Sequence, residues 1–333
     1  MSSSRPPRGI VTPAVTPLRD WSIDAEGISE LLSFLRESGA SAVFPAGSVG
    51  LFHLLSLSEH KRLISEFASR LPSGMALLPG VHRGNLEESV ELARHAKDVG
   101  AAAVVSVPPF YYELGQGEIV EYYSELARLA DVPVIIYNIP QMARNRVDPE
   151  SAAEFQRRTG MLAGLKDSSR DLGSLQGYLA ALPGIPIYEG QDDLLLAARA
   201  LGAWGGVCGT SNFTDLPERV WASGDLEDQR KLSQLMRVLS RYEFPSAYYY
   251  LFQAVVLGRR EPRGYLPRPL APLDARDAER LLSDFRSIVG PARAGRAEKT
   301  YRRSRSRVAQ GHSRWARSSG STYPRASAST SQG

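Results

Sequence analysis

Short apolar runs alternate with longer segments of helical period along the first 224 residues. The runs contain β-branched and small apolar residues and are predicted to be buried strands, at 9–11, 42–44, 76–78, 103–107, 134–136, 161–165, 185–188 and 204–208. The segments between them place apolar residues three and four positions apart, as amphipathic helices do, around 28–35, from 58 onward, and over 86–96, 118–129, 149–158, 172–182, 194–201 and 217–221. The pattern predicts eight strand–helix units.

Eight such units predict the α/β class of fold. Within that class they favour a closed (β/α)8 TIM barrel built from right-handed crossovers. No Gly-x-Gly-x-x-Gly motif follows the first run, so an open dinucleotide-binding sheet is not favoured. Beyond Gly224 only helical periodicity remains, over 226–240, 246–257 and 275–288. We therefore expect a barrel over 1–224, C-terminal helices packed on it over 225–290, and a separate tail over 291–333.

The net charge of this tail is opposite in sign to that of the rest of the chain. The net charge of the 333 residues is +4, but residues 291–333 alone carry +9 and the preceding residues −5. The tail is rich in Arg and Ser and poor in apolar residues, which predicts disorder. A basic segment of this kind can bind nucleic acid, but its few aromatic residues show no stacking pattern. We favour a dispensable extension over a nucleic-acid function.

Other compositional features concern compartment and cofactors. The single cysteine, Cys208, rules out an internal disulfide framework. The N-terminal residues lack the apolar core of a signal peptide, and no apolar run approaches the roughly 20 residues that span a bilayer. We expect a cytoplasmic protein without a membrane partner. The histidines show no ligand spacing, so no metal or other cofactor is expected.

Two residues at the ends of neighbouring predicted strands carry the candidate chemistry. Lys166 ends the sixth strand and Tyr137 the fifth. Burial favours the neutral amine of a lysine, which can attack a carbonyl, and a tyrosine beside it can transfer the protons of Schiff-base formation. Barrel active sites lie at the carboxyl ends of the strands, and adjacent strands are about 4.8 Å apart. The alternative is a lysine whose amine simply reaches solvent.

Loops at the same end of the barrel are candidates for substrate binding. Gly47-Ser48-Val49-Gly50 follows the second strand, and a tight turn of this kind can direct backbone N–H groups at one anion, such as the carboxylate of a keto acid. A polar loop, 188–193, follows the seventh strand, and 206–212 follows the eighth. Both loops are expected to face the mouth that holds Lys166.

Together these motifs resemble the family of dihydrodipicolinate synthase and N-acetylneuraminate lyase, the pyruvate-dependent class I aldolases. The resemblance covers about residues 8–290. It rests on Thr12-Pro13, Thr16-Pro17-Leu18, the 47–50 loop, Pro108-Pro109-Phe110-Tyr111, Tyr137-Asn138-Ile139-Pro140, Gly164-Leu165-Lys166-Asp167 and Gly190-Gln191-Asp192-Asp193.

The resemblance implies a (β/α)8 barrel, usually a homotetramer, that needs no metal. It implies that Lys166 forms the Schiff base, that Tyr137 shuttles protons, and that Tyr111 reaches the site of a neighbouring subunit. Substrate contacts are expected from Ser48, the amides around Val49, Gly190, Gln191, Asp192 and Val207.

Departures from the family pattern bear on the substrate. Met142 occupies the place where the synthases carry a carboxylate-binding arginine, and Leu51 replaces a common glutamate. Leu51 and the run 264–274 are closer to the archaeal 2-keto-3-deoxygluconate aldolases. Val49 lacks the second hydroxyl expected in the loop. Arg144, in place of a usual glycine, either meets an anionic group of the substrate or faces solvent.

The leading hypothesis is a Schiff-base aldolase that interconverts a 2-keto-3-deoxy sugar acid with pyruvate and an aldehyde. A 4-hydroxy-tetrahydrodipicolinate synthase, or a related dehydratase or hydratase using the same imine, is the alternative within the family. A non-catalytic sugar-acid sensor is a third hypothesis, although a sensor has no need of an imine-forming lysine.

Overall fold

Eight parallel strands are hydrogen-bonded in the order β5-β4-β1-β10-β9-β8-β7-β6 in the computed structural model, which describes residues 5–259 and 264–290. The ring closes between β5 and β6, where Val105 N donates to Pro79 O and Val81 N to Val105 O, both at 2.9 Å. The strands are β1 (Gly9–Pro13), β4 (Ala42–Phe44), β5 (Ala76–Leu77), β6 (Val104–Ser106), β7 (Val134–Asn138), β8 (Leu162–Asp167), β9 (Ile187–Glu189) and β10 (Gly205–Val207). The predicted (β/α)8 barrel is confirmed.

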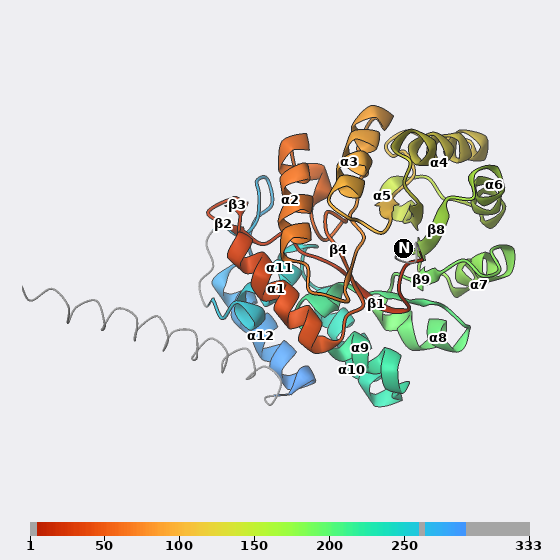
Figure 1. The fold of residues 1–333 in the computed structure, drawn as a ribbon. Helices are drawn as coiled ribbons and strands as arrows, with labels where there is room; N and C mark the ends of the chain where they lie inside the picture. Colours follow the sequence, from red (N-terminus) through yellow and green to blue (C-terminus); the bar gives the residue numbers. More distant parts are fainter. Residues whose placement is uncertain (1–4, 260–263, 291–333) are drawn as a thin grey trace, which may run out of the picture.

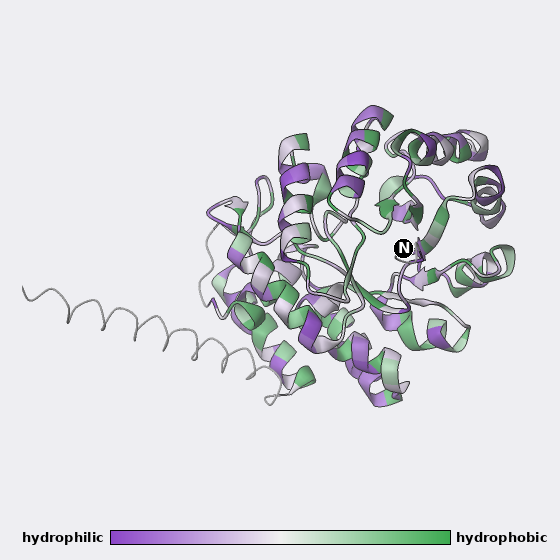
Figure 2. Cartoon of the chain, in the orientation of Figure 1, coloured by the Kyte–Doolittle hydropathy of each residue, from purple (hydrophilic) through white to green (hydrophobic). Residues whose placement is uncertain are grey.

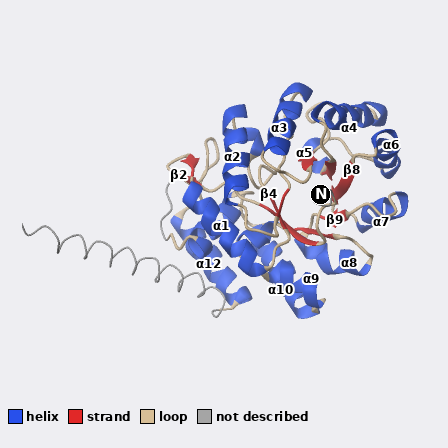
Figure 3. Cartoon of the chain, viewed as in Figure 1, coloured by secondary structure: helices blue, strands red, loops and turns tan. Residues whose placement is uncertain are grey.

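Helices surround the strands as a ring, with the barrel axis toward the viewer in Figure 1 and the strands in red at the centre of Figure 3. Figure 2 shows that these helices combine hydrophobic and hydrophilic positions, as the predicted periodicity requires. They are α1 (Ala25–Ser38), α2 (Leu57–Arg70), α3 (Leu86–Asp98), α4 (Gln116–Ala130), α6 (Pro149–Thr159), α7 (Leu172–Ala181), α8 (Leu195–Ala200) and α9 (Leu216–Ser223).

The start of α2 differs from the sequence prediction, which placed it near Ser58. The N-cap is Ser56, whose side chain accepts a hydrogen bond from Glu59 N, while the Glu59 carboxylate accepts one from Ser56 N. This is a capping box, and with it the helix begins at Leu57, one residue before the predicted start.

The C-terminal region is helical, as predicted, with one irregularity. It contains α10 (Leu226–Leu239), α11 (Ser246–Leu251), the π-helical turn η4 (Phe252–Val256) and α12 (Ala275–Val289). The single helix expected over 246–257 therefore changes its hydrogen-bonding pattern at Phe252. Helix α12 packs on α10 and α11, and α10 packs on α9. The exact domain limits stay a prediction, and the expected disordered tail lies outside the described residues.

Two small elements were not predicted. A hairpin of β2 (Leu18–Arg19) and β3 (Ser22–Ile23) follows β1, and a single helical turn, α5 (Pro140–Ala143), follows β7. Both are too short to leave a periodic signal in the sequence. Within the described residues, no helix is long and apolar enough to cross a membrane.

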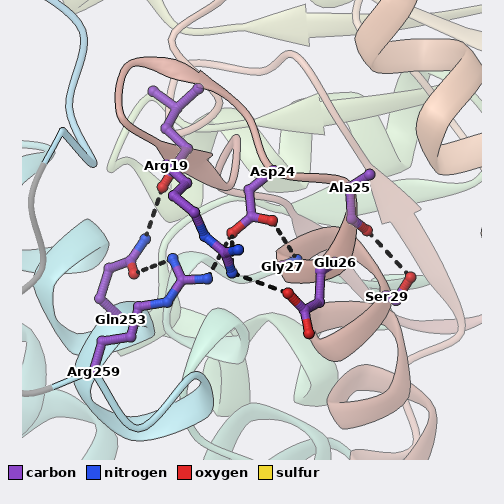
Figure 4. Close-up of polar contacts among 9 residues, drawn as sticks. Arg19, Asp24, Ala25, Glu26, Gly27, Ser29, Gln253 and Arg259 are labelled. Carbon is purple, nitrogen blue, oxygen red and sulfur yellow. Dashed lines mark hydrogen bonds and ion pairs between the residues drawn. The ribbon is translucent and has the colours of Figure 1, made fainter. Parts of the chain in front are cut away.

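An ionic cluster around the buried Asp24 joins this hairpin and α1 to the C-terminal region (Figure 4). Asp24 caps α1 by accepting from Gly27 N, and its other oxygen lies 2.6 Å from the Arg259 guanidinium and 3.3 Å from that of Arg19. Gln253, in η4, accepts from Arg259 and donates to Leu18 O. Burial would raise the pKa of Asp24, but hydrogen bonds from Arg259 and Gly27 outweigh it and lower the pKa.

Replacing Asp24 with alanine should destabilise the fold by roughly 1–3 kcal/mol, because the helix loses its N-cap and Arg259 loses its partner. Asp24→Asn keeps the cap acceptor and should cost less than Asp24→Ala. Urea unfolding of the two variants measures this. Equal stability of Asp24→Ala and the wild type would show that the cluster contributes nothing.

Candidate active site

Lys166 and Tyr137 lie directly opposite each other on β8 and β7, as paired positions of the parallel ladder. The Lys166 amine is 3.7 Å from the centre of the Tyr137 ring and 5.4 Å from that of Phe44. The exposed fractions of Lys166 and Tyr137 are 5% and 3%. The prediction that these side chains meet is confirmed, and the alternative of a lysine reaching solvent is wrong.

The interior around this pair is apolar. Side chains from every second position of the strands fill the barrel, among them Val11, Leu78, Val105, Ile135 and Val207. In such surroundings a hydrogen bond or a charge interaction is stronger than in water, because little solvent screens it. Few polar groups reach this interior, and the interactions between those groups are therefore only weakly screened.

The loop after β4 brings Ser48 to this pair. Ser48 Oγ lies 3.4 Å from the Tyr137 hydroxyl. Gly50 allows the loop to fold tightly, because a Cβ there would approach Ala46 N to 2.9 Å and Ala14 O to 3.0 Å. Ala46 adopts a positive φ of 56°, which further bends the backbone. The predicted carboxylate loop therefore adjoins the candidate catalytic tyrosine.

Val49 does not present its side chain as a binding group, since that side chain is buried in the main apolar core. Val207, in contrast, lies on the inner face of β10. The contribution of Val49 to a bound substrate is thus limited to its backbone, whereas Val207 can supply an apolar wall. Their contact with a substrate stays a prediction.

Gly190 is packed against the lysine itself. A Cβ at Gly190 would lie 3.0 Å from Lys166 Cε and 1.9 Å from Ser168 Oγ, so only glycine fits here. Its backbone N donates to Asp167 O at 2.7 Å. Gln191, the next residue, has its side-chain amide 3.5 Å from Ser168 O, which places it beside the same strand end.

The Asp192 carboxylate is hydrogen-bonded within the protein, and its contact with a substrate stays a prediction. Its carboxylate accepts from Gly209 N at 3.1 Å, Thr210 N at 2.9 Å and Thr210 Oγ1 at 2.5 Å. Burial raises the pKa of this carboxyl and the three hydrogen bonds oppose the change. Asp192 thereby ties the loop after β9 to the loop after β10, a role that the sequence did not reveal.

Tyr111 is not brought to Lys166 within the chain. Its exposed fraction is 76%, its φ is 84°, and its ring packs edge-on against Tyr112 with centres 5.1 Å apart. The buried amide of Asn145 holds the loop by donating to Pro109 O and Tyr112 O and accepting from Leu114 N. The tyrosine thus projects outward from a well-anchored loop.

Sequence reasoning missed Ser168, which directly follows the Lys166-Asp167 pair. Its hydroxyl is buried beside Gly190 and has no hydrogen-bond partner among the described residues. An unpartnered buried hydroxyl near the Lys166 side chain can donate to or accept from a bound molecule. A hydroxyl residue just beyond a strand that ends in lysine was the available signal.

His82 was also missed as a neighbour of the site. It is fully buried, and its ring packs edge-on against Phe52, Phe44 and Tyr137, with centres 4.2, 6.4 and 6.4 Å apart respectively. Burial lowers the pKa of His82 to about 3, so this ring is uncharged at neutral pH. Nothing in the spacing of the histidines indicates this contact. No group of three or more His, Cys, Asp or Glu side chains that could hold a metal occurs in the described part of the chain.

Comparison with known proteins supports a specific family. The family model described as "Dihydrodipicolinate synthetase family" matches residues 6–284. The chain belongs to the dihydrodipicolinate synthetase family.

Named relatives in this family include both aldolases and synthases. The chain is 34% identical to the 2-dehydro-3-deoxy-D-gluconate/2-dehydro-3-deoxy-phosphogluconate aldolase of Picrophilus torridus, over 72% of this chain and 92% of that one. It is 31% identical to the 4-hydroxy-tetrahydrodipicolinate synthase of Methanopyrus kandleri, over 71% and 81%. The solved 2-keto 3-deoxygluconate aldolase from Picrophilus torridus aligns with a TM-score of 0.74 at 33% identity, covering 80% of this chain and 98% of that one.

Two buried glutamates near the carboxyl ends of the strands make stability depend on pH. Burial is the main cause that raises the pKa of Glu189 and of Glu218 to about 8. In the unfolded chain the same groups ionise near their ordinary value of about 4.3. The folded protein therefore holds protons that the unfolded chain releases between these limits.

The free energy of unfolding should accordingly fall as pH rises from about 5 to about 8. Glu218→Gln removes one of the two groups, so the variant should gain stability relative to the wild type across that window. Denaturant unfolding at pH 5, 6.5 and 8 tests the change in slope. A constant difference between the two proteins at all three pH values would contradict the assignment.

Proposed function

We propose that this chain is a class I, Schiff-base-forming aldolase that interconverts a 2-keto-3-deoxy sugar acid with pyruvate and an aldehyde. The observation that carries the proposal is the placement of the Lys166 amine 3.7 Å from the ring of Tyr137, whose hydroxyl is 3.4 Å from Ser48 Oγ. A nucleophilic amine, an acid/base hydroxyl and a second hydroxyl thus converge in an apolar interior. These are the groups that imine chemistry requires.

In the cleavage direction, the loop 47–50 binds the substrate carboxylate through backbone N–H groups, which directs the adjacent keto carbon at Lys166. The neutral amine attacks this carbon to give a carbinolamine. Tyr137 donates a proton to the departing hydroxyl, so water leaves and an iminium ion forms. Ser48 is positioned to exchange protons with Tyr137.

Carbon–carbon cleavage then uses the iminium ion as an electron sink. Tyr137, now deprotonated, accepts the proton of the C4 hydroxyl as the C3–C4 bond breaks, and the aldehyde departs. The bonding electrons become the enamine on Lys166. Protonation of that enamine at C3, followed by attack of water on the iminium carbon, releases pyruvate and restores the free amine.

Features near the mouth favour a neutral aldehyde over an anionic one. Met142, on α5, is 57% exposed and cannot pair with a carboxylate. Arg144 lies 3.9 Å from Glu113 with most of its side chain in solvent. Ser168 and Gln191 offer neutral hydrogen-bonding groups beside Lys166. The relative that is 34% identical is named for both 2-dehydro-3-deoxy-D-gluconate and 2-dehydro-3-deoxy-phosphogluconate, which supports a sugar-acid substrate but not the choice between a neutral and an anionic aldehyde.

We further propose a cytoplasmic homotetramer in which Tyr111 completes a neighbouring subunit's site. The support is the outward position of this tyrosine on a loop that Asn145 holds with three hydrogen bonds. A hydroxyl supplied in this way could extend the Tyr137–Ser48 pair toward solvent. The one cysteine, Cys208, is buried and free, which fits a reducing compartment.

Borohydride reduction in the presence of pyruvate should add one pyruvyl group to a peptide that contains Lys166, because reduction makes the imine permanent. Lys166→Arg retains the positive charge but cannot form the imine, and should remain unmodified. Peptide mass spectrometry measures both. Labelling of the arginine variant, or no labelling of the wild type at saturating pyruvate, would refute the mechanism.

Condensation of pyruvate with glyceraldehyde should have a higher kcat/KM than condensation with aspartate semialdehyde. A charge-assisted hydrogen bond contributes roughly 1.5–3 kcal/mol and an arginine can form one or two with a carboxylate, so the absence of an arginine at Met142 predicts on the order of 10–10³-fold weaker selection of the anionic aldehyde. Met142→Arg should shift the ratio toward aspartate semialdehyde.

Arg144→Ala is the matched control for this comparison, since it removes the nearest other cation on the same loop. The aldehyde preference should survive this change. A wild-type preference for aspartate semialdehyde that disappears in Arg144→Ala would instead indicate a synthase of the lysine pathway type.

A further inference from the structure

Asn138 and Asp167 are the residues next to Tyr137 and Lys166, and they form a second pair on the outer face of the same two strands. The ladder places Asn138 opposite Asp167, just as it places Tyr137 opposite Lys166. Successive side chains of a strand point to opposite faces, so the outer pair turns toward the helices. Both side chains are buried, and Asn138 Nδ2 donates to Asp167 Oδ1 at 2.8 Å.

The remaining polar atoms of this pair are also satisfied. Asn138 Oδ1 accepts from Val147 N at 3.1 Å. The Asp167 carboxylate accepts from Ser169 N at 3.1 Å and from Ser169 Oγ at 3.0 Å. The pair therefore connects the two strand ends with the loops that follow each of them. A buried network whose members are all paired is rigid, whereas loss of one member leaves costly unpaired groups.

The backbone continues these connections across a third strand. Ser168 N donates to Asn138 O at 2.8 Å, and Gly190 N donates to Asp167 O at 2.7 Å. Glu189 pairs with Asp167 in the ladder. Burial, and to a lesser degree the charge of Asp167, raises the pKa of Glu189 to about 8, so Glu189 is protonated at neutral pH.

We propose that Asn138 and Asp167 are a positioning pair: their side-chain hydrogen bond holds the ends of β7 and β8 in the register that keeps Tyr137 against Lys166. This inference rests on the proposed function for its catalytic consequence. The physical reason is that the last residues of a strand are held by the preceding part of the ladder but have no further ladder residues after them. Without the cross-link, the last residues of β7 and β8 can separate, and a displacement of about 1 Å can cost on the order of 10²-fold in rate.

The pair has a polarity that can be reversed. Asn138 supplies the donor and Asp167 the acceptor, so Asn138→Asp places two carboxylates against each other. Adding Asp167→Asn restores a donor and an acceptor with the roles exchanged. Val147 N can still donate to position 138, and Ser169 Oγ to the remaining oxygen at position 167, whereas Ser169 N loses the oxygen that it shares with Asn138 in the wild type. The double substitution moves the carboxylate from position 167 to position 138 but restores the hydrogen bond between the two side chains. It therefore tests whether this hydrogen bond is what positions the strand ends.

We expect Asn138→Asp to lower kcat for aldol condensation on the order of 10²-fold, with KM for pyruvate changed by less than about threefold, since the carboxylate loop is untouched. The double variant Asn138→Asp with Asp167→Asn should recover kcat to within about tenfold of the wild type. Asp24→Asn is the control, because it alters a buried aspartate at the start of α1 and should lower Tm without lowering kcat.

Three results would overturn the proposal. One is a folded Asn138→Asp enzyme with wild-type kcat. Another is a double variant that recovers Tm but not kcat, which would assign the effect to the charge of Asp167 rather than to register. If Asn138→Asp does not fold, Asn138→Ala provides the test, with an expected loss of about tenfold in kcat. The third contradicting result is a wild-type kcat in Asn138→Ala.

Pyruvate trapping separates this inference from the proposed function. If the wild type forms no borohydride-stable adduct, the Schiff-base function fails. If the wild type forms the adduct and the folded Asn138 variants form it at the same rate, the function stands and the positioning role fails. Slower trapping in these variants, restored in the double variant, supports both.

Discussion

The parallel pairing of β7 with β8 is the constraint on which the candidate site depends. Its register sets Tyr137 beside Lys166 on the inner face of the barrel. A shift of either strand by one residue would send its own side chain to the opposite face and separate the two, because side chains alternate along a strand. The chemistry therefore relies on a feature of backbone hydrogen bonding, and the apolar residues on both faces of these strands make that register specific.

Burying a lysine in such a place has a cost that the surroundings reduce. The Tyr137 ring faces the amine, and an N–H group directed at an aromatic face is weakly favourable. Gly190 leaves room at Lys166 Cε for the side chain to extend. The aromatic rings of Phe44 and His82 pack edge-on against Tyr137 and restrict its movement. The result is a polar pair held by close packing, with few other hydrogen-bonding groups nearby.

The loops around the mouth are anchored largely by buried polar side chains. Asp192 holds the loop after β10, Asn145 holds the loop that carries Tyr111, and Asn138 holds Val147. Each of these side chains bonds to backbone groups that a loop would otherwise leave unpaired in a buried position. The barrel strands supply the framework, and these few residues determine where the loops lie upon it.

The sequence by itself determined the eight strands, their helices and the adjacency of Tyr137 and Lys166, because periodicity reports burial and the eightfold alternation allows essentially one closed arrangement. It also indicated the glycine loop beside Ser48. It could not reveal that the Asp192 carboxylate accepts a hydrogen bond from Thr210, that Tyr111 turns away from the site of its own chain, or that His82 packs on Tyr137. These contacts join residues from separate loops, whose paths depend on tertiary packing and leave no periodic signal. Only the tertiary structure shows which polar residues lie beside Lys166 and Tyr137 and which are bonded to other loops, because these contacts depend on how the loops pack.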